Sequence, residues 1–454
     1  MAVIQPIEVS LEAGNLAEHS AALDDDGRPR RTGTVFTASA HIVTAVIGSG
    51  VLSLPWAVAQ LGWAAGPPVM LVFGAVMYYT STLLADCYRA GDPAAGRRSY
   101  SYMEAVRAIL GRGRRVAFCG VIQYANLAAI AVGYTIAASI SMQAVWRANC
   151  FHHARGHAGA DGAACRSSSV PYMVAFGAVQ LLFSQIPDFD QIQWLSVVAS
   201  VMSFAYSGIG LGLAVAQTVS NGAFRGSLTG VAVGAGATVM QKVWRTMQAL
   251  GNIAFAYSFS NVLIEVQDTI RAPPPSEAAV MKKATALSIA TTTAFYTLCG
   301  CMGYAAFGDA APDNLLTGFG IYETTSPSGS STRAAAAWLE SAFVSKELRL
   351  GPFAPTALRL AWRSSFVCLA TVVAMALPFF GSVVGLIGAF TFWPLTVDFP
   401  VEMYIKQRAV KRGSTEWICL KALAAVCLVV SVAAAAGSIA SFVGAFKVFR
   451  PFSG

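Results

Sequence analysis

Charged residues are scarce in this chain of 454 residues. Asp, Glu, Lys and Arg together make up 12% of it, and 55% of the residues are hydrophobic. Soluble globular domains carry about 25% charged residues, so the chain has too few charges to cover the surface of a soluble particle of its size. This excludes an ordinary soluble enzyme and predicts a polytopic membrane protein.

Two further features are missing. The first 31 residues contain six acidic residues and no apolar run, so we expect no cleavable signal peptide and interpret residues 1–31 as a disordered cytoplasmic N-terminal tail. No basic run is interleaved with aromatic residues, as a nucleic-acid groove requires. The net charge of +8 therefore indicates basic cytoplasmic loops and not a nucleic-acid partner.

Apolar runs of spanning length are abundant. They do not alternate with polar residues, which is typical of membrane helices and not of barrel strands, so the predicted fold class is an all-α polytopic membrane protein. Because about 20 apolar residues cross the hydrocarbon core of a lipid bilayer, we expect ten spans, near residues 35–60, 65–87, 116–142, 171–187, 193–216, 246–265, 284–306, 364–380, 383–403 and 417–444.

The basic residues orient these spans, because cytoplasmic loops carry an excess of Lys and Arg. Loop 88–115 contains seven arginines, so it should be cytoplasmic, and the N-terminus then lies inside. Loop 266–283 falls on the same side and is basic too, with Arg271, Lys282 and Lys283. Loop 143–170 falls outside.

The outer loop contains Cys150 and Cys165, with His152, His153 and His157 between them. These residues could together ligate a metal ion, but no Cys-x-x-Cys motif or regular His spacing is present. A disulfide between Cys150 and Cys165 is the favoured interpretation, because the exterior is oxidising. We expect no bound metal.

The charge pattern breaks after the seventh span. Residues 307–343 are mostly polar, and the mildly apolar stretch 334–343 is too short to cross. Yet the basic segments 346–363 and 406–412 both require the cytoplasmic side, so one crossing is missing between about 323 and 343. Three explanations remain open: a helix is absent, the last three helices insert inverted, or the weak segment is drawn partly into the membrane.

The first span contains Gly48-Ser49-Gly50 in mid-membrane, followed by Pro55. Glycine and proline weaken a helix interior, and a broken helix exposes backbone groups that are tolerated only where they line a cavity or bind a ligand. The second half-helix would offer free N–H groups near Gly50 and Val51 to a carboxylate. Close helix packing through small residues is the alternative.

The sixth span has a similar stretch of small and polar residues around Tyr257. Breaks in the first and sixth spans are expected when a transporter is built from two inverted five-helix repeats. We therefore assign a transmembrane domain to residues 32–446. It has repeats at about 35–216 and 246–403, an extra helix at 417–444 and a C-terminal tail at 447–454.

From about Thr32 to Phe452 the chain resembles the plant amino acid permeases of the amino acid/auxin permease family. The resemblance rests on long motifs in the same order, HIVTAVIGSGVLSLPWAVAQLGW, IPDFDQIQWLS, GNIAFAYSFSNVLIEVQDTI, YAAFGDAAPDNLLTGFG and GLIGAFTFWPLTVDFPVEMYI. It implies a proton-coupled importer of amino acids in the plasma membrane, with H⁺ as the coupling ion and no cofactor. It also implies eleven spans and an inverted-repeat fold similar to that of the bacterial leucine transporter.

The resemblance further implies a substrate site at the two breaks. The α-carboxylate of the amino acid would bind Gly48, Ser49 and Gly50. Its amino group and side chain would approach four residues of the sixth span, Asn252, Ala256, Tyr257 and Ser258. Tyr124 and Asn126 of the third span could line the opposite wall or form an interhelical hydrogen bond.

Two features depart from the family pattern. Many relatives have Asp where this chain has Asn252, and family members continue the NLLTGF motif into an apolar eighth span, where this chain has IYETTSPSGSSTRAAAAW. The second departure coincides with the break in the charge pattern and predicts about ten spans here instead of eleven. Because that helix walls the substrate site in the fold, its absence bears on transport itself.

His41 is the only histidine in any span, and no Asp or Glu lies in mid-span. It precedes Gly48 by seven residues, about 10 Å along a helix. Histidine changes its charge between about pH 5 and 8, which suits uptake driven by an acidic exterior. We expect His41 to couple transport to protons, the alternative being a neutral imidazole bonded to a neighbouring carbonyl.

The sequence thus predicts a proton/amino acid symporter that works by alternating access. Enzymatic activity is not expected, since nucleophile-elbow, P-loop, HExxH and dinucleotide motifs are absent in their structural context. One alternative is a transport-defective truncated or splice-variant permease that regulates intact relatives, and another is a sensor that binds amino acids without moving them. An auxin influx carrier is a weaker option.

Overall fold

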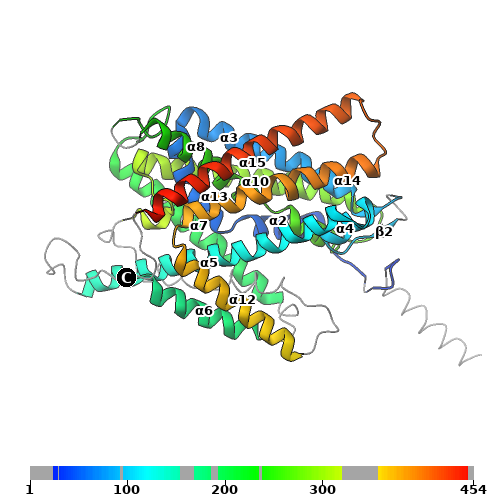
Figure 1. Ribbon diagram of the computed structural model, residues 1–454, viewed down its shortest axis with the longest axis horizontal. Coiled ribbons are helices and arrows are strands. Elements are labelled where there is room, and N and C mark those ends of the chain that lie inside the picture. Colours follow the sequence, from blue (N-terminus) through cyan, green and yellow to red (C-terminus); the bar gives the residue numbers. More distant parts are fainter. Residues whose placement is uncertain are drawn as a thin grey trace, which may run out of the picture.

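Long helices running side by side build the protein (Figure 1). The computed structural model describes residues 24–28, 30–92, 96–153, 168–185, 193–234, 238–319 and 356–447. Within these residues, six helical stretches are long and apolar enough to cross a membrane, and three shorter helices are also apolar. Each of the ten predicted apolar runs lies on a helix, so the all-α polytopic fold class is confirmed.

The helices of the first half and the short hairpin between two of them follow the chain in order. They are α2 (Val35–Val46), η1 (Ser49–Ser53), α3 (Leu54–Asp86), the strands β1 (Arg89–Ala90) and β2 (Arg97–Arg98), α4 (Tyr102–Leu110), α5 (Arg114–His153), α6 (Val170–Ser184) and α7 (Gln193–Asn221).

The second half begins with α8 (Val239–Tyr257), α9 (Ser260–Gln267) and α10 (Glu277–Phe307) and continues through two short turns, η4 (Gly308–Ala310) and η5 (Leu315–Thr317). It then resumes with α12 (Thr356–Ala376), α13 (Phe380–Thr391), η6 (Phe392–Asp398), α14 (Phe399–Gln407) and α15 (Thr415–Phe446).

Hydroxyl side chains begin several of these helices. Thr34 before α2 and Thr238 before α8 each form a reciprocal capping box with the residue three positions on, while Ser276 and Ser414 cap α10 and α15. Each cap satisfies a backbone N–H that has no partner within the helix. These local signals fix where the spans start.

Helix α3 contains the turn between the first two spans. Gly62 has a φ of +77°, a conformation that residues with a side chain rarely adopt. A Cβ added to it would lie 2.3 Å from the amide nitrogen of Gly230. The amide of Trp63 donates to the carbonyl of Ser227, so the turn is held by a loop that is distant in sequence.

Buried apolar side chains form two clusters. The larger includes α2, η1, α3, α8, α9 and α10. The smaller joins α5, α6, α12 and α13 to the end of α15. The first and sixth spans therefore share one packed cluster, which also takes in α4, η6, α14 and part of α15.

Glycines bring α8 into close contact with its neighbours. A Cβ added to Gly388 of α13 would lie 2.0 Å from the carbonyl oxygen of Gly251, and one added to Gly437 of α15 would lie 2.5 Å from the carbonyl oxygen of Trp244. Small residues of this kind let helix backbones approach each other in a membrane, where lipid removes the usual hydrophobic gain. They fix α8 against α13 and α15.

Contacts at the helix termini define the two ends of the bundle. Arg89 after α3 forms an ion pair with Glu277 at the start of α10, and Gln407 at the end of α14 donates to the carbonyl of Arg89. We call this the inner end; Figure 1 labels β2 and α4 there. Asn221 at the end of α7 donates to the carbonyl of Ala306, which marks the outer end.

The last three helices are not inverted in this structure. Arg363 donates to the carbonyl of Ser184, so α12 starts beside the end of α6, at the inner end where α7 also begins. Phe319, in contrast, packs edge-on against Phe307 at the outer end. Helix α12 therefore begins at the end of the bundle opposite to Phe319, and residues 320–355 lie outside the described part. The stretch 323–343 lies there, and the other two explanations for the missing crossing stay open.

The contact between α8 and α13 gives a stability prediction. Gly388→Ala forces a methyl group into the Gly251 carbonyl, and overpacking of this kind costs about 1–3 kcal/mol. Gly212 on α7 has nothing within 4 Å of an added Cβ, so Gly212→Ala serves as the control. Thermal unfolding in detergent should show a lower Tm for Gly388→Ala alone. Equal Tm values for the two variants would contradict the close contact.

Candidate functional site

Two spans are broken where the sequence predicts it. Helix α2 ends at Val46, and Gly48 is extended, with φ −124° and ψ −160°, before η1 begins. Helix α8 ends at Tyr257, and Ser258 is extended, with φ −81° and ψ 96°, before α9 begins. Each span is therefore a pair of half-helices joined by a short extended segment.

The two breaks lie against each other. A Cβ added to Gly50 would lie 2.9 Å from the Cα of Ala256 and 3.1 Å from the ring of Phe255. The small residue at position 50 is what lets the backbone of η1 approach α8 so closely. The junction brings together Ser49, Gly50, Val51, Ala256 and Tyr257, all buried, and Gly48 and Ser258, both half-buried.

Neither half-helix beyond the breaks has a side-chain cap. Gly48 before η1 and Phe259 before α9 make no capping hydrogen bond, and the first N–H groups of a helix have no partner within it. The N-terminus of a helix carries a positive partial charge that favours carboxylates. The start of η1 therefore has the character of an anion-binding site.

Tyr134 of α5 faces this position and was not among the sequence-predicted residues. A Cβ added to Gly48 would lie 3.0 Å from the Tyr134 hydroxyl, so the hydroxyl lies at the start of η1. The Gly133-Tyr134 pair in the middle of the third span was the available signal, but nothing in the sequence relates it to Gly48.

A second tyrosine joins the helix ends that precede the breaks. The Tyr296 hydroxyl of α10 lies 2.5 Å from the carbonyl oxygen of Val46 and 3.2 Å from that of Ala256. Its ring packs edge-on against Tyr257, with centroids 5.4 Å apart, and the side chain is fully buried. This residue, too, was missed by the sequence analysis.

Asn252 lies one helical turn before Ala256 and packs next to α13 and α15. The Asn252 side chain is fully buried. A Cβ added to Gly385 of α13 would lie 2.7 Å from the amide oxygen of Asn252 and 2.8 Å from the hydroxyl of Ser438 on α15. Neither amide atom of Asn252 has a hydrogen-bond partner within the described residues. Asn252 therefore faces α13 and α15, and its contact with substrate stays a prediction without geometric support.

The structure does not bring Tyr124, Asn126 or His41 to the junction. Tyr124 is 53% exposed and Asn126 is buried; they precede Tyr134 by ten and eight residues, about 15 and 12 Å along α5. His41 is exposed on α2. Their predicted roles remain open.

The cysteines of the outer loop are only partly described. Cys150 is disulfide-bonded, while Cys165 and the side chains of the three histidines lie outside the described residues, so the pairing stays a prediction. Within the described part of the chain, no group of three or more His, Cys, Asp or Glu side chains is placed to hold a metal ion.

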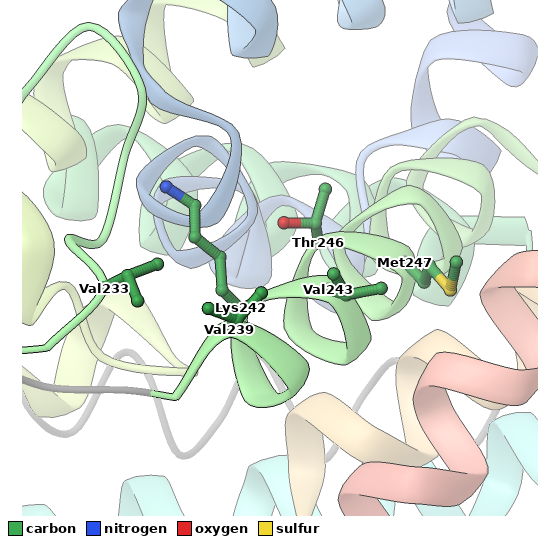
Figure 2. A pocket seen from close by; sticks show the side chains of 6 residues that line it. All are labelled: Val233, Val239, Lys242, Val243, Thr246 and Met247. Atoms are coloured by element: carbon green, nitrogen blue, oxygen red, sulfur yellow. The ribbon is translucent and has the colours of Figure 1, made fainter.

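A shallow depression on the first turns of α8 is separate from the junction (Figure 2). Lys242 at its edge donates to the carbonyl of Thr229. Met247, on its far side, precedes Tyr257 by ten residues, about 15 Å along the helix. The lining is almost entirely apolar and comprises Val233, Val239, Lys242, Val243, Thr246 and Met247.

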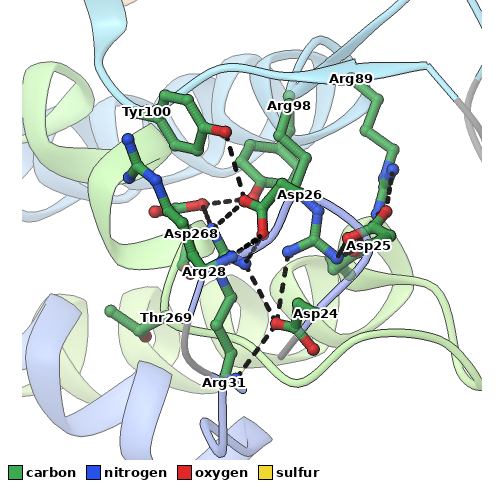
Figure 3. Close-up of polar contacts among 12 residues, drawn as sticks. Asp24, Asp25, Asp26, Arg28, Arg31, Arg89, Arg98, Tyr100, Asp268 and Thr269 are labelled. Atoms are coloured by element: carbon green, nitrogen blue, oxygen red, sulfur yellow. Dashed lines mark hydrogen bonds and ion pairs between the residues drawn. The ribbon is translucent and has the colours of Figure 1, made fainter. Parts of the chain in front are cut away.

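An ion-pair network closes the inner end (Figure 3). Asp24, Asp25 and Asp26, which precede α2, pair with Arg31, Arg89 and Arg98. The network reaches Asp268 after α9 through Arg31, and Glu277 at the start of α10 through Arg89. It therefore ties together the inner ends of α2, α3, α9 and α10. We call these residues the inner network.

The inner network corrects one expectation. Residues 1–31 were expected to form a disordered tail, but residues 24–28 and 30–31 are held against four helices. The reason is charge pairing: the three aspartates neutralise arginines whose side chains are buried, with Arg31, Arg89 and Arg98 all below 10% exposed. Residues 1–23 lie outside the described part.

The network keeps its charges over a wide pH range. The hydrogen bond from Arg31 lowers the pKa of Asp26 well below its ordinary value. Burial works against the charged form of Arg31, but hydrogen bonds to Asp26 and Asp24 outweigh it and raise the pKa of the guanidinium. Both partners therefore stay ionised at physiological pH.

Two broken helices that meet inside a bundle of spans define a class of protein, the secondary transporters built from inverted repeats. A sequence profile of the family "Transmembrane amino acid transporter protein" matches residues 31–337 and 331–443. The chain belongs to this family and is a multi-pass membrane protein. Membership confirms the expectation that it is not an enzyme.

Relatives and a solved structure agree with this assignment. Amino acid permease 2 of Arabidopsis thaliana is 56% identical, over 94% of this chain and 92% of its own. Amino acid permease 3 of the same plant is 54% identical, over 95% of each chain. A crystal structure of MhsT in complex with L-phenylalanine has a TM-score of 0.54 at 12% identity and covers 91% of this chain and 100% of that chain. The last comparison confirms the leucine-transporter-like fold.

These comparisons also show a gap. The alignment with amino acid permease 2 has 459 positions, more than the 454 residues of this chain, yet it spans only 94% of the chain. The alignment positions at which amino acid permease 2 has a residue and this chain has none outnumber the residues of one membrane helix, about 20. The two profile matches meet at residues 331–337, inside the stretch where the sequence lacks an apolar eighth span.

The inner network gives a pH prediction. Because the pKa of Asp26 is lowered on folding, its contribution to stability is complete above the ordinary carboxylate pKa of about 3.9 and is lost only as pH falls below it. Asp26→Asn should lower Tm by the same amount at pH 7 and pH 5. The difference should shrink at pH 3.5. A difference already lost at pH 5 would contradict the assigned pairing.

Proposed function

We propose that this chain is a proton-coupled amino acid symporter that imports amino acids across the plasma membrane by alternating access. The observation that carries the proposal is the contact between the two helix breaks at Gly50 and Ala256, in a chain of this family. The names of its relatives and the amino acid bound to MhsT support the substrate class.

The junction suits a zwitterion. The start of η1, with Gly48 and the Tyr134 hydroxyl beside it, would receive the α-carboxylate through the backbone N–H groups of Ser49 and Gly50, since the Gly48 amide already donates to the Val46 carbonyl. The end of α8 carries the negative partial charge of a helix C-terminus and would attract the α-ammonium group. Tyr257 and Ser258, at the second break, would contact the amino acid side chain.

Alternating access would then require the inner end to open at the inner network. Secondary transporters of this architecture move one group of helices against another around a fixed site. Here α2, α3, α9 and α10 share one apolar cluster and are tied at the inner end by the inner network. Release of substrate to the cytoplasm would require α2 to part from α9, which breaks the Arg31–Asp268 ion pair and the backbone hydrogen bonds between Gly33 and residues 269–271.

A second candidate function has specific support. The alignment with amino acid permease 2 contains more unmatched positions than one membrane helix has residues. The two family matches overlap at residues 331–337, inside the stretch where the sequence lacks an apolar eighth span. A chain without that wall could bind amino acids and not move them, acting as a sensor or as a regulator of intact relatives. Binding and flux must therefore be measured separately.

The test uses purified protein in liposomes with an acidic exterior. Labelled neutral amino acids should accumulate, and uptake should stop when a protonophore removes the gradient. Gly50→Val places a branched side chain against Ala256 and should abolish uptake, whereas Gly212→Ala should not. Amino-acid-dependent stabilisation without flux would overturn the symporter and favour the sensor; auxin uptake in the same liposomes would favour the carrier alternative.

His41 gives a separate prediction for coupling. If His41 carries the coupling proton, His41→Ala should leave uptake independent of external pH between pH 5 and 8. Phe36→Ala, on the same helix and 77% exposed in the wild type, serves as the control and should keep the pH dependence. A full pH dependence with uptake retained in His41→Ala would exclude this role.

A further inference from the structure

We propose that the Tyr296 hydroxyl takes the place of a bound monovalent cation between the two broken helices, so that this chain binds amino acids without sodium. The consequence for transport rests on the symporter function proposed above. The structural claim, that the Tyr296 hydroxyl fills a cation position, does not depend on the symporter function.

The position has the character of a cation site. Val46 is the last residue of α2, and Ala256 lies at the end of α8, so both carbonyls belong to helix C-termini, which carry a negative partial charge. Their oxygens converge on one point, 2.5 and 3.2 Å from the Tyr296 oxygen. In transporters with broken helices, carbonyls of this kind coordinate the coupling ion.

A tyrosine hydroxyl meets the same electrostatic demand with a single proton. The O–H donates to the Val46 carbonyl at the shorter distance, and its partial positive charge also faces the Ala256 carbonyl. The Val46 carbonyl also accepts from the Gly48 amide, but without the hydroxyl no donor would lie between the two buried carbonyls, at a depth where lipid cannot supply one. The hydroxyl hydrogen thus presents a partial positive charge at the point where a bound cation would otherwise lie.

Helix α10 is anchored so that it can place this hydroxyl. The Ser39 hydroxyl of α2 donates to the carbonyl of Ala284, and the Ser288 hydroxyl donates to the carbonyl of Ser39. Ser288 precedes Tyr296 by eight residues and Ser39 precedes Val46 by seven, so the two helices keep register over about 10–12 Å. Tyr257 holds the ring from the side of α8.

This arrangement makes Tyr296 a positioning residue with a consequence for ion specificity. The amino acid would bind to half-helices whose relative position is set by a side chain instead of by a dissociable ion. A chain with a built-in donor at this point has no need of external sodium, which fits coupling to protons. Removing the hydroxyl should recreate a site for a small cation.

The experiment compares melting temperatures of purified wild type and variants in NaCl and in an equal concentration of N-methyl-D-glucamine chloride. Tyr296→Phe removes only the hydroxyl. Tyr296→Asn also leaves space and adds an amide oxygen, a good ligand for a hard cation. Tyr304→Phe is the matched control on the same helix: its hydroxyl bonds Ser227 and Asp309 at the outer end.

Wild type should melt at the same temperature in both salts. Tyr296→Phe and Tyr296→Asn should melt lower than wild type in the organic salt and recover part of the loss in NaCl, with a dependence on sodium concentration. Tyr304→Phe should melt lower in both salts alike. Should Tyr296→Phe prove too unstable to purify, Tyr296→Asn decides the question, because the added oxygen keeps the cavity polar.

Two results would overturn the proposal. One is a sodium-dependent Tm in the wild type, which would show that a cation binds although Tyr296 is present. The other is a Tyr296→Asn protein whose Tm does not respond to sodium. Neither readout involves transport, so a chain that failed to take up amino acids would refute the symporter function and leave this test intact.

Discussion

Backbone hydrogen bonding inside a membrane is the constraint on which this structure depends. A helix that stops in the hydrocarbon region leaves N–H and C=O groups without partners, and lipid cannot supply them. Here the carbonyls before both breaks share the Tyr296 hydroxyl, and the backbone of η1 packs on α8 where Gly50 has no side chain. The exposed groups are thereby concentrated at one junction, which is where a zwitterionic substrate can pair with them.

The surrounding helices serve this junction. Glycines at 251, 388 and 437 press α8 against α13 and α15, and serine bonds hold α2 beside α10. The inner network then closes the inner end by joining α2, α3, α9 and α10. In a transporter such a closure must be stable, and it must also be able to open without unpacking the rest of the helix bundle. Ion pairs at a helix end meet both needs, because they break without disturbing the packed glycine contacts.

Sequence patterns predicted the spans and the breaks but not the side chains from other helices that contact the two breaks. Continuous apolar runs located every described helix that crosses the bundle, and Gly48-Ser49-Gly50 marked the first interruption. Tyr134 and Tyr296 escaped because apolar periodicity says that a position is buried and not which distant carbonyl it meets. The same limit left the contacts of Asn252 with α13 and α15 unforeseen. Asp24 to Asp26 were assigned to a free tail because their arginine partners lie far along the chain.

The most direct test of this account is a cryo-EM map of the chain with a neutral amino acid bound. The account predicts the carboxylate at the start of η1, within hydrogen-bond distance of the backbone N–H groups at Ser49 and Gly50 and close to the Tyr134 hydroxyl. The ammonium group should face the end of α8. An amino acid bound in the depression near Val239 and Met247, with the junction between Gly50 and Ala256 unchanged and empty, would contradict it.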